Sequence, residues 1–158
     1  MLLFVKEMDE IFAEEILSWK YEAPYDFYNN EYSVDAVREL LSRSYSAVLD
    51  DQDEVFGFFC IGESAQVPIG AGFGAYSEDF IDVGFGMNPV FTGKGLGLSF
   101  LTFILQQISN VYGATPIRLT VAEFNSRAIH LYEKLGFVRE MEFSHGDIVF
   151  MTMVKHTG

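Results

Sequence analysis

Apolar positions in the first third of the chain form one short run, followed by two stretches in which they recur at helical spacing. The run at residues 2–5 predicts a strand. Asp9 predicts the N-cap of a helix that extends to about Lys20, and Ser33 predicts the N-cap of a second helix. Residues 21–32, which are aromatic and acidic and contain a proline, predict an irregular connection between the two helices.

Beyond the second predicted helix the apolar period shortens to two, which is typical of strands. Residues 45–49 and 55–61 predict a hairpin around the acidic turn 50–54, which is expected to be solvated. Residues 80–87 predict the next strand. The glycine-rich segment 70–76 before it fits part of a strand edge or a loop.

The last third returns to a helical period between strands, and Gly113 and Gly136 predict the ends of its two helices. These elements are a helix that opens at residues 93–97 and runs to about 112, a strand at 117–121, a helix capped by Asn125 or Ser126, and a hairpin of 137–143 with 148–154. The order β-α-α-β-β-β-α-β-α-β-β predicts one α/β domain of the α+β type over residues 1–158. Its mixed, largely antiparallel central sheet has about seven strands with about four helices.

Composition fits a folded domain, because 49% of the 158 residues are apolar and 21% are charged. The single cysteine, Cys60, cannot form an intrachain disulfide and is expected to be buried. No Cys/His cluster has the spacing of a structural zinc site, so no metal is expected. The sequence shows neither a signal-peptide pattern nor an apolar stretch of about 18 residues, and the expected location is cytoplasmic.

The chain is strongly acidic, with 23 Asp and Glu against 10 Lys and Arg and a net charge of −13. Nucleic acid and anionic membranes are therefore not expected as partners, because both need a basic face. The charge is unevenly distributed: residues 1–90 hold 18 acidic and 4 basic side chains, whereas residues 91–158 hold 5 and 6.

A glycine-rich segment between a predicted strand and a predicted helix is the strongest candidate for chemistry. Gly93, Gly95 and Gly97 alternate there, and amides at such a junction suit a phosphate or pyrophosphate. The segment has neither the GxxxxGK[ST] pattern of a P-loop nor the GxGxxG dinucleotide fingerprint. A tight turn with close helix packing is the alternative explanation.

The segment Thr92-Gly93-Lys94-Gly95-Leu96-Gly97 resembles the acyl-CoA loop of the GNAT N-acetyltransferases, Arg/Gln-x-x-Gly-x-Gly/Ala. Gly95 and Gly97 match the pattern. Thr92 stands where the family usually has Arg or Gln, which leaves the amide cradle in place, and Lys94 can still meet a phosphate.

A second segment is similar to the family signature Asn-x-x-Ala-x-x-x-Tyr-x-x-x-Gly-Phe. All five fixed positions match, at Asn125, Ala128, Tyr132, Gly136 and Phe137. The resemblance implies a GNAT-like acyl-CoA N-acyltransferase fold. It also implies an enzyme that transfers an acetyl group from acetyl-CoA to a primary amine by direct attack in a ternary complex.

The resemblance further implies how acetyl-CoA would be held. Pantetheine pairs with backbone at residues 86–90, the pyrophosphate sits on the amides of 93–98, and Asn125 reaches the pantetheine arm. Tyr132 is the expected acid for the departing thiolate. The expected cofactor-binding residues are Met87, Asn88, Val90, Thr92, Gly93, Lys94, Gly95, Leu96, Gly97, Leu98, Asn125, Ala128, Tyr132 and Lys134.

The general base is less well defined. Ribosomal-protein alanine acetyltransferases of this family carry Glu at the position of Thr120, and this departure argues against that function. Asp82 is the expected base, directly or through water, with Glu123, water alone or no base as alternatives. His130 is expected to face solvent.

The resemblance implies that the first two helices, their connection and the last hairpin form the acceptor pocket. Tyr25, Asp26 and Tyr28 in the connection are the expected substrate-binding residues, because rings and carboxylates suit a cationic small-molecule or peptide amine. Alternatively the rings only cover the core. A monomer or homodimer is expected. The rival functions are a non-catalytic acyl-CoA sensor of the same fold and a nucleotide-binding protein of another fold.

Overall fold

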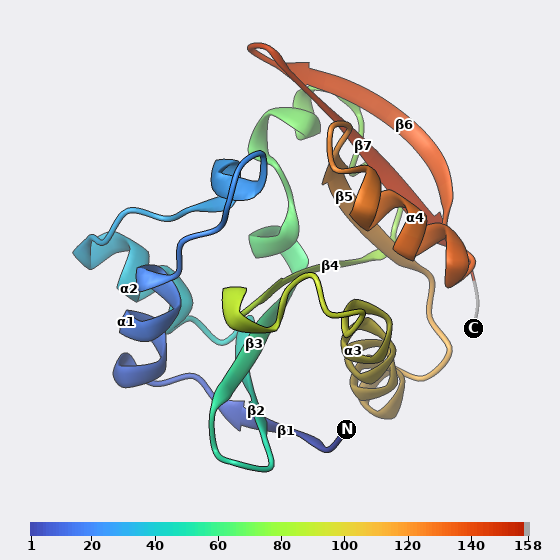
Figure 1. Ribbon diagram of the computed structural model, residues 1–158. Coiled ribbons are helices and arrows are strands. Elements are labelled where there is room, and N and C mark those ends of the chain that lie inside the picture. Colours follow the sequence, from blue (N-terminus) through green and yellow to red (C-terminus); the bar gives the residue numbers. More distant parts are fainter. Residues whose placement is uncertain (157–158) are drawn as a thin grey trace. The chain divides into compact units, whose positions relative to one another are not determined.

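The computed structural model describes residues 1–156, and within them a seven-stranded sheet has the order β1-β2-β3-β4-β5-β7-β6 (Figure 1). The strands are β1 (Leu3–Glu7), β2 (Tyr45–Asp50), β3 (Val55–Ile61), β4 (Ile81–Met87), β5 (Ile117–Ala122), β6 (Val138–His145) and β7 (Ile148–Lys155). The α-helices are α1 (Glu10–Ser18), α2 (Val34–Leu40), α3 (Gly97–Tyr112) and α4 (Ser126–Lys134). None of these helices is long and apolar enough to cross a bilayer.

The strand pairing confirms the predicted mixed, largely antiparallel sheet. β1 with β2, β2 with β3, β5 with β7 and β6 with β7 are all antiparallel. β4 and β5 form a parallel pair, and its register joins Ile81 to Ile117 and Asp82 to Arg118. The predicted order of strands and helices is therefore confirmed.

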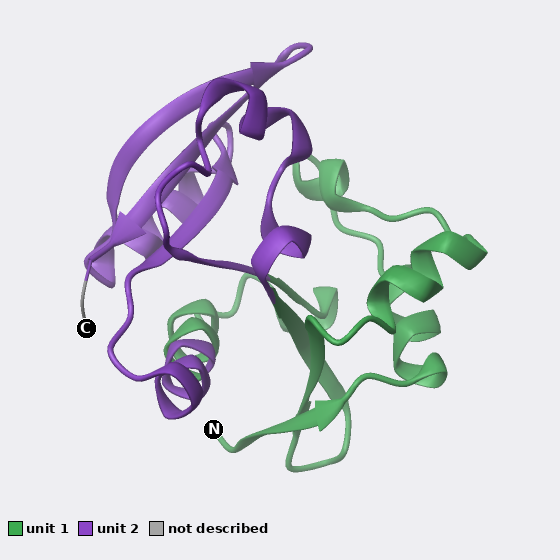
Figure 2. Ribbon diagram, turned by 180° about the vertical axis from the view of Figure 1, so that it is seen from behind, with its two compact units in different colours: residues 1–60, 85–103 green, residues 61–84, 104–158 purple. Residues whose placement is uncertain are grey.

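The chain divides into two compact units (Figure 2). Unit 1 comprises residues 1–60 and 85–103, and unit 2 comprises residues 61–84 and 104–158. β4 and α3 each contribute residues to both units.

The core of unit 1 forms where α1 and α2 bury their apolar faces. Asp9 caps α1 by accepting a 2.8 Å hydrogen bond from the amide of Phe12, and Ser33 caps α2 by accepting a 3.0 Å bond from the amide of Ala36, as predicted. The buried cluster consists of Met8, Ala13, Ile16, Leu17, Trp19, Leu40, Ala47, Leu49 and Val55. β3 and β4 approach closely at Gly57, where an added Cβ would lie 2.5 Å from the carbonyl oxygen of Gly86.

Unit 2 is built on the long antiparallel strands β5, β7 and β6. Leu119, Met151 and Met153 on these strands are buried, and Ile129 of α4 is buried as well. Gly136 lies just beyond the end of α4, and its φ of +93° is the left-handed conformation that glycine adopts most readily. Gly113 follows α3 with a φ of +75°, so both predicted helix ends are confirmed.

Short 3₁₀ helices account for the main differences from the sequence-based expectation. The strand edge considered for residues 70–76 is wrong, because 3₁₀ helix η3 (Pro68–Phe73) and a turn at Gly74 occupy this stretch. Another, η2 (Gly62–Ala65), follows β3, and η1 (Tyr25–Tyr28) lies in the connection predicted as irregular. α3 begins at Gly97, since Gly93 and Gly95 have positive φ and cannot belong to it.

Candidate active site

The glycine segment of unit 1 forms a turn between η4 (Pro89–Phe91) and α3. Gly93 and Gly95 have φ angles of +73° and +75°, and a Cβ added at either would meet no atom within 4 Å. The turn therefore presents its backbone to open space in a conformation that other residues adopt at a cost. It leads into a 16-residue helix with no acidic residue in its first turn. These features suit the binding of an anion.

The side chains around this turn differ in their availability. The hydroxyl of Thr92 donates a 2.8 Å hydrogen bond to the carbonyl of Pro89, so it closes η4 rather than pointing outward. Lys94 is exposed, and Val90 and Leu98 are 62% and 44% exposed. Lys94 is therefore the cation of the predicted loop that a phosphate could reach.

Asn88 has a structural role that the sequence did not reveal. Its Nδ2 donates to the carbonyl of Val55 at 3.0 Å, its Oδ1 accepts from the amide of Val90 at 3.2 Å, and its backbone amide donates to Phe56 at 2.8 Å. The side chain is 9% exposed. It fastens the end of β4 to β3, and its backbone carbonyl accepts a 2.9 Å hydrogen bond from the amide of Phe91. Each polar group of Asn88 therefore has a partner within unit 1, and its contact with a cofactor stays a prediction.

The three residues predicted to bind the acceptor all lie in η1 of unit 1. Tyr25 is half-buried, whereas Asp26 and Tyr28 are exposed. The ring of Tyr28 packs edge-on against Phe27, with the centroids 5.1 Å apart. No residue of η1 is buried, which argues against the alternative that these rings only cover the core.

Helix α4 of unit 2 carries the second predicted motif. Asn125 caps the helix, its Oδ1 accepting a 3.1 Å hydrogen bond from the amide of Ala128. Tyr132 is 7% exposed, and its ring centroid lies 6.2 Å from that of Phe137. Lys134 is exposed in the last turn, where a cation complements the helix dipole. The motif thus encodes a capped helix as well as its proposed chemistry.

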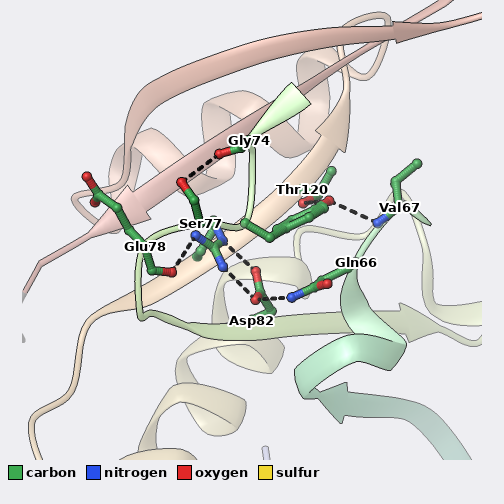
Figure 3. Close-up of polar contacts among 9 residues, drawn as sticks. Gln66, Val67, Gly74, Ser77, Glu78, Asp82 and Thr120 are labelled. Carbon is green, nitrogen blue, oxygen red and sulfur yellow. Dashed lines mark hydrogen bonds and ion pairs between the residues drawn. The ribbon is translucent and has the colours of Figure 1, made fainter. Parts of the chain in front are cut away.

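Asp82, the predicted base, is held in a buried ion pair at the start of β4 (Figure 3). Its Oδ1 and Oδ2 accept hydrogen bonds from Nε and Nη2 of Arg118 at 2.6 and 2.8 Å. Gln66 Nε2 donates to Oδ2 at 2.8 Å. Asp82 is 4% exposed and Arg118 is 1% exposed. This arrangement favours a structural role for Asp82, and its role as the base stays a prediction.

Arg118 organises the surroundings of that ion pair. Its Nη1 donates a 3.1 Å hydrogen bond to the carbonyl of Glu78, and its guanidinium carbon lies 5.0 Å from the ring centroid of Tyr76 and 5.3 Å from that of Phe80. Hydrogen bonding to Asp82 raises the pKa of Arg118 despite the opposing effect of burial. Ion pair and rings together hold the segment between β3 and β4 onto β5.

Thr120 forms a hydroxyl pair with Tyr76 at 2.9 Å (Figure 3). The Tyr76 oxygen also accepts a 2.9 Å hydrogen bond from the amide of Val67, so its own hydrogen is available to Thr120. Thr152 lies opposite Thr120 in the β5–β7 register. Its buried Oγ1 has no hydrogen-bond partner among the described residues.

Glu123, the alternative base, lies just beyond β5 on the surface of unit 2. It lines a pocket of about 240 Å³ together with Phe124, Asp147, Ile148 and Val149. Two carboxylates, those of Glu123 and Asp147, therefore border one hollow whose other residues are apolar. Such a lining suits the cationic end of an amine as well as a base, and it offers no basic group to an anion.

Two curated proteins of Bacillus subtilis match part of the sequence. They are a probable spermine N(1)-acetyltransferase of subspecies natto strain BEST195 and a spermine/spermidine N(1)-acetyltransferase of strain 168. Each is 38% identical to this chain over 47 residues, which is 30% of this chain and 31% of the relative. The match therefore spans about a third of the relatives' length.

Solved structures match almost the entire chain. An acetyltransferase (GNAT family) from Bacillus anthracis has a TM-score of 0.72 and 14% identity, covering 98% of this chain and 94% of that one. The aminoglycoside acetyltransferase AAC(6')-Ib in complex with coenzyme A has a TM-score of 0.71 and 21% identity, with coverages of 98% and 95%. A dodecameric spermidine N-acetyltransferase from Vibrio cholerae has a TM-score of 0.66 and 20% identity, with coverages of 98% and 93%. At these identities the likeness shows a shared fold.

The family model for the acetyltransferase (GNAT) family matches residues 7–137. This span contains the glycine turn before α3, the capped helix α4 and Tyr132. The sequence-based resemblance is thereby confirmed, and the chain belongs to the acetyltransferase (GNAT) family.

Proposed function

We propose that the protein is an N-acetyltransferase that moves an acetyl group from acetyl-CoA to a cationic primary amine. The observation that carries this proposal is the glycine turn before α3, with its left-handed Gly93 and Gly95 facing open space. Membership of the acetyltransferase family supports the same reaction class. The whole chain of 158 residues is proposed as one acetyltransferase domain that works as a monomer or homodimer.

In this proposal the backbone of the turn binds the pyrophosphate of acetyl-CoA. The amides of residues 93–98 and the first turn of α3 supply hydrogen-bond donors and a positive partial charge, and Lys94 adds a full charge. The backbone of residues 86–90 is proposed to pair with pantetheine. Asn125 and Ala128 at the start of α4 stay predicted cofactor-binding residues. The acyl donor then presents its thioester carbon to the amine.

Tyr132 is proposed as the acid that protonates the departing thiolate. Its ring is almost entirely buried on α4, which fixes the direction of the hydroxyl. The neutral amine attacks the thioester carbonyl directly in the ternary complex, so no acetylated residue of the protein is formed. The base stays open among Asp82, Glu123, water and no dedicated base, and the ion pair with Arg118 weighs against Asp82.

The acceptor is proposed to be a cationic small-molecule or peptide amine. The rings and carboxylate of Tyr25, Asp26 and Tyr28 are accessible in η1, and Glu123 and Asp147 border the pocket of unit 2. The matched relatives are named for spermine and spermidine, which are polyamines and carry several positive charges. Charge attraction and cation–π contacts would both favour such acceptors.

A non-catalytic acyl-CoA-binding protein is the second candidate. Two observations favour it: Thr92 replaces the usual Arg or Gln, and Asp82 is engaged by Arg118. The two functions are separated by incubating the protein with acetyl-CoA and a panel of amines. An enzyme releases free thiol at a rate that depends on the amine, whereas a sensor binds acetyl-CoA in calorimetry and releases none.

A further inference from the structure

Tyr21 connects the segment between α1 and α2 to the end of β4. It lies three residues beyond the last residue of α1, Ser18, and its hydroxyl donates a 2.8 Å hydrogen bond to the backbone carbonyl of Met87. The two residues are 66 positions apart, and both belong to unit 1. The contact therefore joins the segment that carries η1 to the strand that carries the proposed pantetheine-binding backbone.

Two further hydrogen bonds join the two ends of this segment to each other. The amide of Tyr21 donates a 2.7 Å hydrogen bond to Oδ1 of Asn29, and Nζ of Lys20 donates a 3.1 Å bond to the carbonyl of Asn30. Inside this closure, the amide of Asn29 donates to the carbonyl of Asp26 at 3.0 Å. Residues 20–30 thus form a loop whose two ends are joined by hydrogen bonds. Tyr21 lies at this closed end and sets where the loop lies on β4.

The hydrogen bond of Tyr21 persists over the working range of pH. Burial raises the pKa of Tyr21 to about 12, so the hydroxyl keeps its proton at neutral pH and remains a donor. A carbonyl oxygen has two lone pairs. Met87 can therefore accept from Tyr21 and from a ligand amide at the same time.

We propose that Tyr21 is a positioning residue that holds the acceptor-binding loop in register with the strand that binds the acyl donor. This inference rests on the proposed function, because it takes η1 as part of the acceptor site and residues 86–90 as the pantetheine strand. Tyr21 acts through Met87 and the loop, without touching the reacting atoms. Its effect is therefore expected in the use of the acceptor and not in the affinity for acetyl-CoA.

The test compares Tyr21→Phe with Tyr32→Phe, which makes the same chemical change in the same connection. Tyr32 is 64% exposed, and its hydroxyl makes only a 3.5 Å contact with Glu14. Tyr21→Phe is expected to raise the acceptor KM about three- to tenfold, because the substitution removes one partly buried hydrogen bond. The dissociation constant for acetyl-CoA, measured by calorimetry, is expected to stay within about twofold. Tyr32→Phe is expected to leave both constants unchanged.

A second variant guards against a trivial folding defect. Asn29→Ala removes the acceptor of the Tyr21 amide and so opens the closed end of the loop, while the Tyr21 side chain and Met87 stay unchanged. It is expected to raise the acceptor KM as well. The inference is overturned if Tyr21→Phe leaves the acceptor KM unchanged, or if it weakens acetyl-CoA binding by as much as acceptor use. A wild-type protein that binds acetyl-CoA but acetylates no amine overturns the proposed function itself, and this inference with it.

Discussion

At the scale of single residues, Tyr132 carries the chemical step of the proposed reaction. Tyr132→Phe removes one hydroxyl and keeps the buried ring that packs near Phe137. If the hydroxyl protonates the leaving thiolate, kcat is expected to fall by about a hundredfold or more. Affinity for acetyl-CoA, measured by calorimetry, should be retained. A variant with wild-type kcat would remove Tyr132 from the mechanism.

Asp82 is the residue whose two proposed roles make opposite predictions. Asp82→Asn keeps the shape of the side chain but leaves the buried guanidinium of Arg118 without its countercharge. A structural role predicts a loss of roughly 3–5 kcal/mol in the free energy of unfolding, measured by urea denaturation. Asp79→Asn, at an exposed position of the same segment, is the control and should cost little.

The catalytic alternative for Asp82 gives a different pattern in the same two variants. If Asp82 is the base, Asp82→Asn would change the free energy of unfolding little. The pH dependence of kcat/KM would then lose its acidic limb. That result would contradict the structural role assigned here to the ion pair.

Residue roles were predictable from sequence where the partners are near each other in the chain. The caps at Asp9, Ser33 and Asn125 follow local rules, because each bonds an amide three residues ahead. By contrast, Asp82 meets Arg118 across 36 positions, and Tyr21 meets Met87 across 66. A single sequence carries no local pattern for such pairs. Asp82 was therefore assigned without its partner Arg118, and the contact of Tyr21 with Met87 was not predicted.

At the scale of elements, the role of the glycine turn before α3 can be tested by a glycine-to-alanine substitution, which adds one methyl group. Gly95→Ala places a Cβ in open space but at a φ of +75°, which costs an L-residue about 1–2 kcal/mol. The melting temperature is expected to fall by about 2–8 °C. Acetyl-CoA affinity should fall as well, because the strained turn redirects its amides.

Gly72→Ala is the matched control for that substitution. Gly72 also has no atom within 4 Å of an added Cβ, and it lies outside the positive-φ glycines. It is expected to change neither the melting temperature nor the affinity for acetyl-CoA. Equal effects of the two substitutions would show that the left-handed turn has no special role.

Helix α1 carries a carboxylate, Glu15, that is repelled by the negative charge of Glu54. Burial raises the pKa of Glu15, the negative charge of Glu54 raises it further, and a hydrogen bond with Trp19 opposes both. A raised folded-state pKa means that stability is fully present below the unfolded pKa and is lost as the pH rises through the folded value. Glu15 therefore weakens the fold at neutral pH.

Glu54→Gln removes the repelling charge and should raise the melting temperature at pH 7 by about 1 °C. The gain should disappear in acid, because protonation of Glu15, whose pKa is raised, removes the charge that Glu54 repels. Asp51→Asn, at an exposed position of the same turn, is the control. A gain that persists in acid would contradict the charge-repulsion argument.

The elements were predictable because their apolar periods are long and their ends carry caps or glycines. The 3₁₀ segments were not, because stretches such as Pro68–Phe73 are too short to show a period. Their position depends on tertiary contacts. At Gly70, an added Cβ would lie 2.7 Å from the ring of Phe143, so only a glycine lets η3 approach β6 so closely.

At the scale of the whole molecule, the excess of acidic side chains fits a reaction with a cationic acceptor. The net charge is −13, and 18 of the 23 acidic residues precede residue 91. The glycine turn and α4, which are proposed to bind an anionic co-substrate, lie in the later part, where the charges nearly balance. Net acidity thus opposes nucleic acid as a partner and favours a cationic acceptor.

The proposed acetyl transfer to a cationic amine can be tested by measuring thiol release from acetyl-CoA with spermidine and with an arylamine, which is uncharged at neutral pH. We expect thiol release that depends on spermidine, together with an N-acetylated product detected by mass spectrometry. We also expect that kcat/KM for spermidine falls as salt rises from about 0.05 to 0.5 M, because salt screens the acidic acceptor side. Binding of acetyl-CoA without any amine-dependent thiol release would contradict the enzymatic claim, and a salt-independent preference for the arylamine would contradict the cationic acceptor.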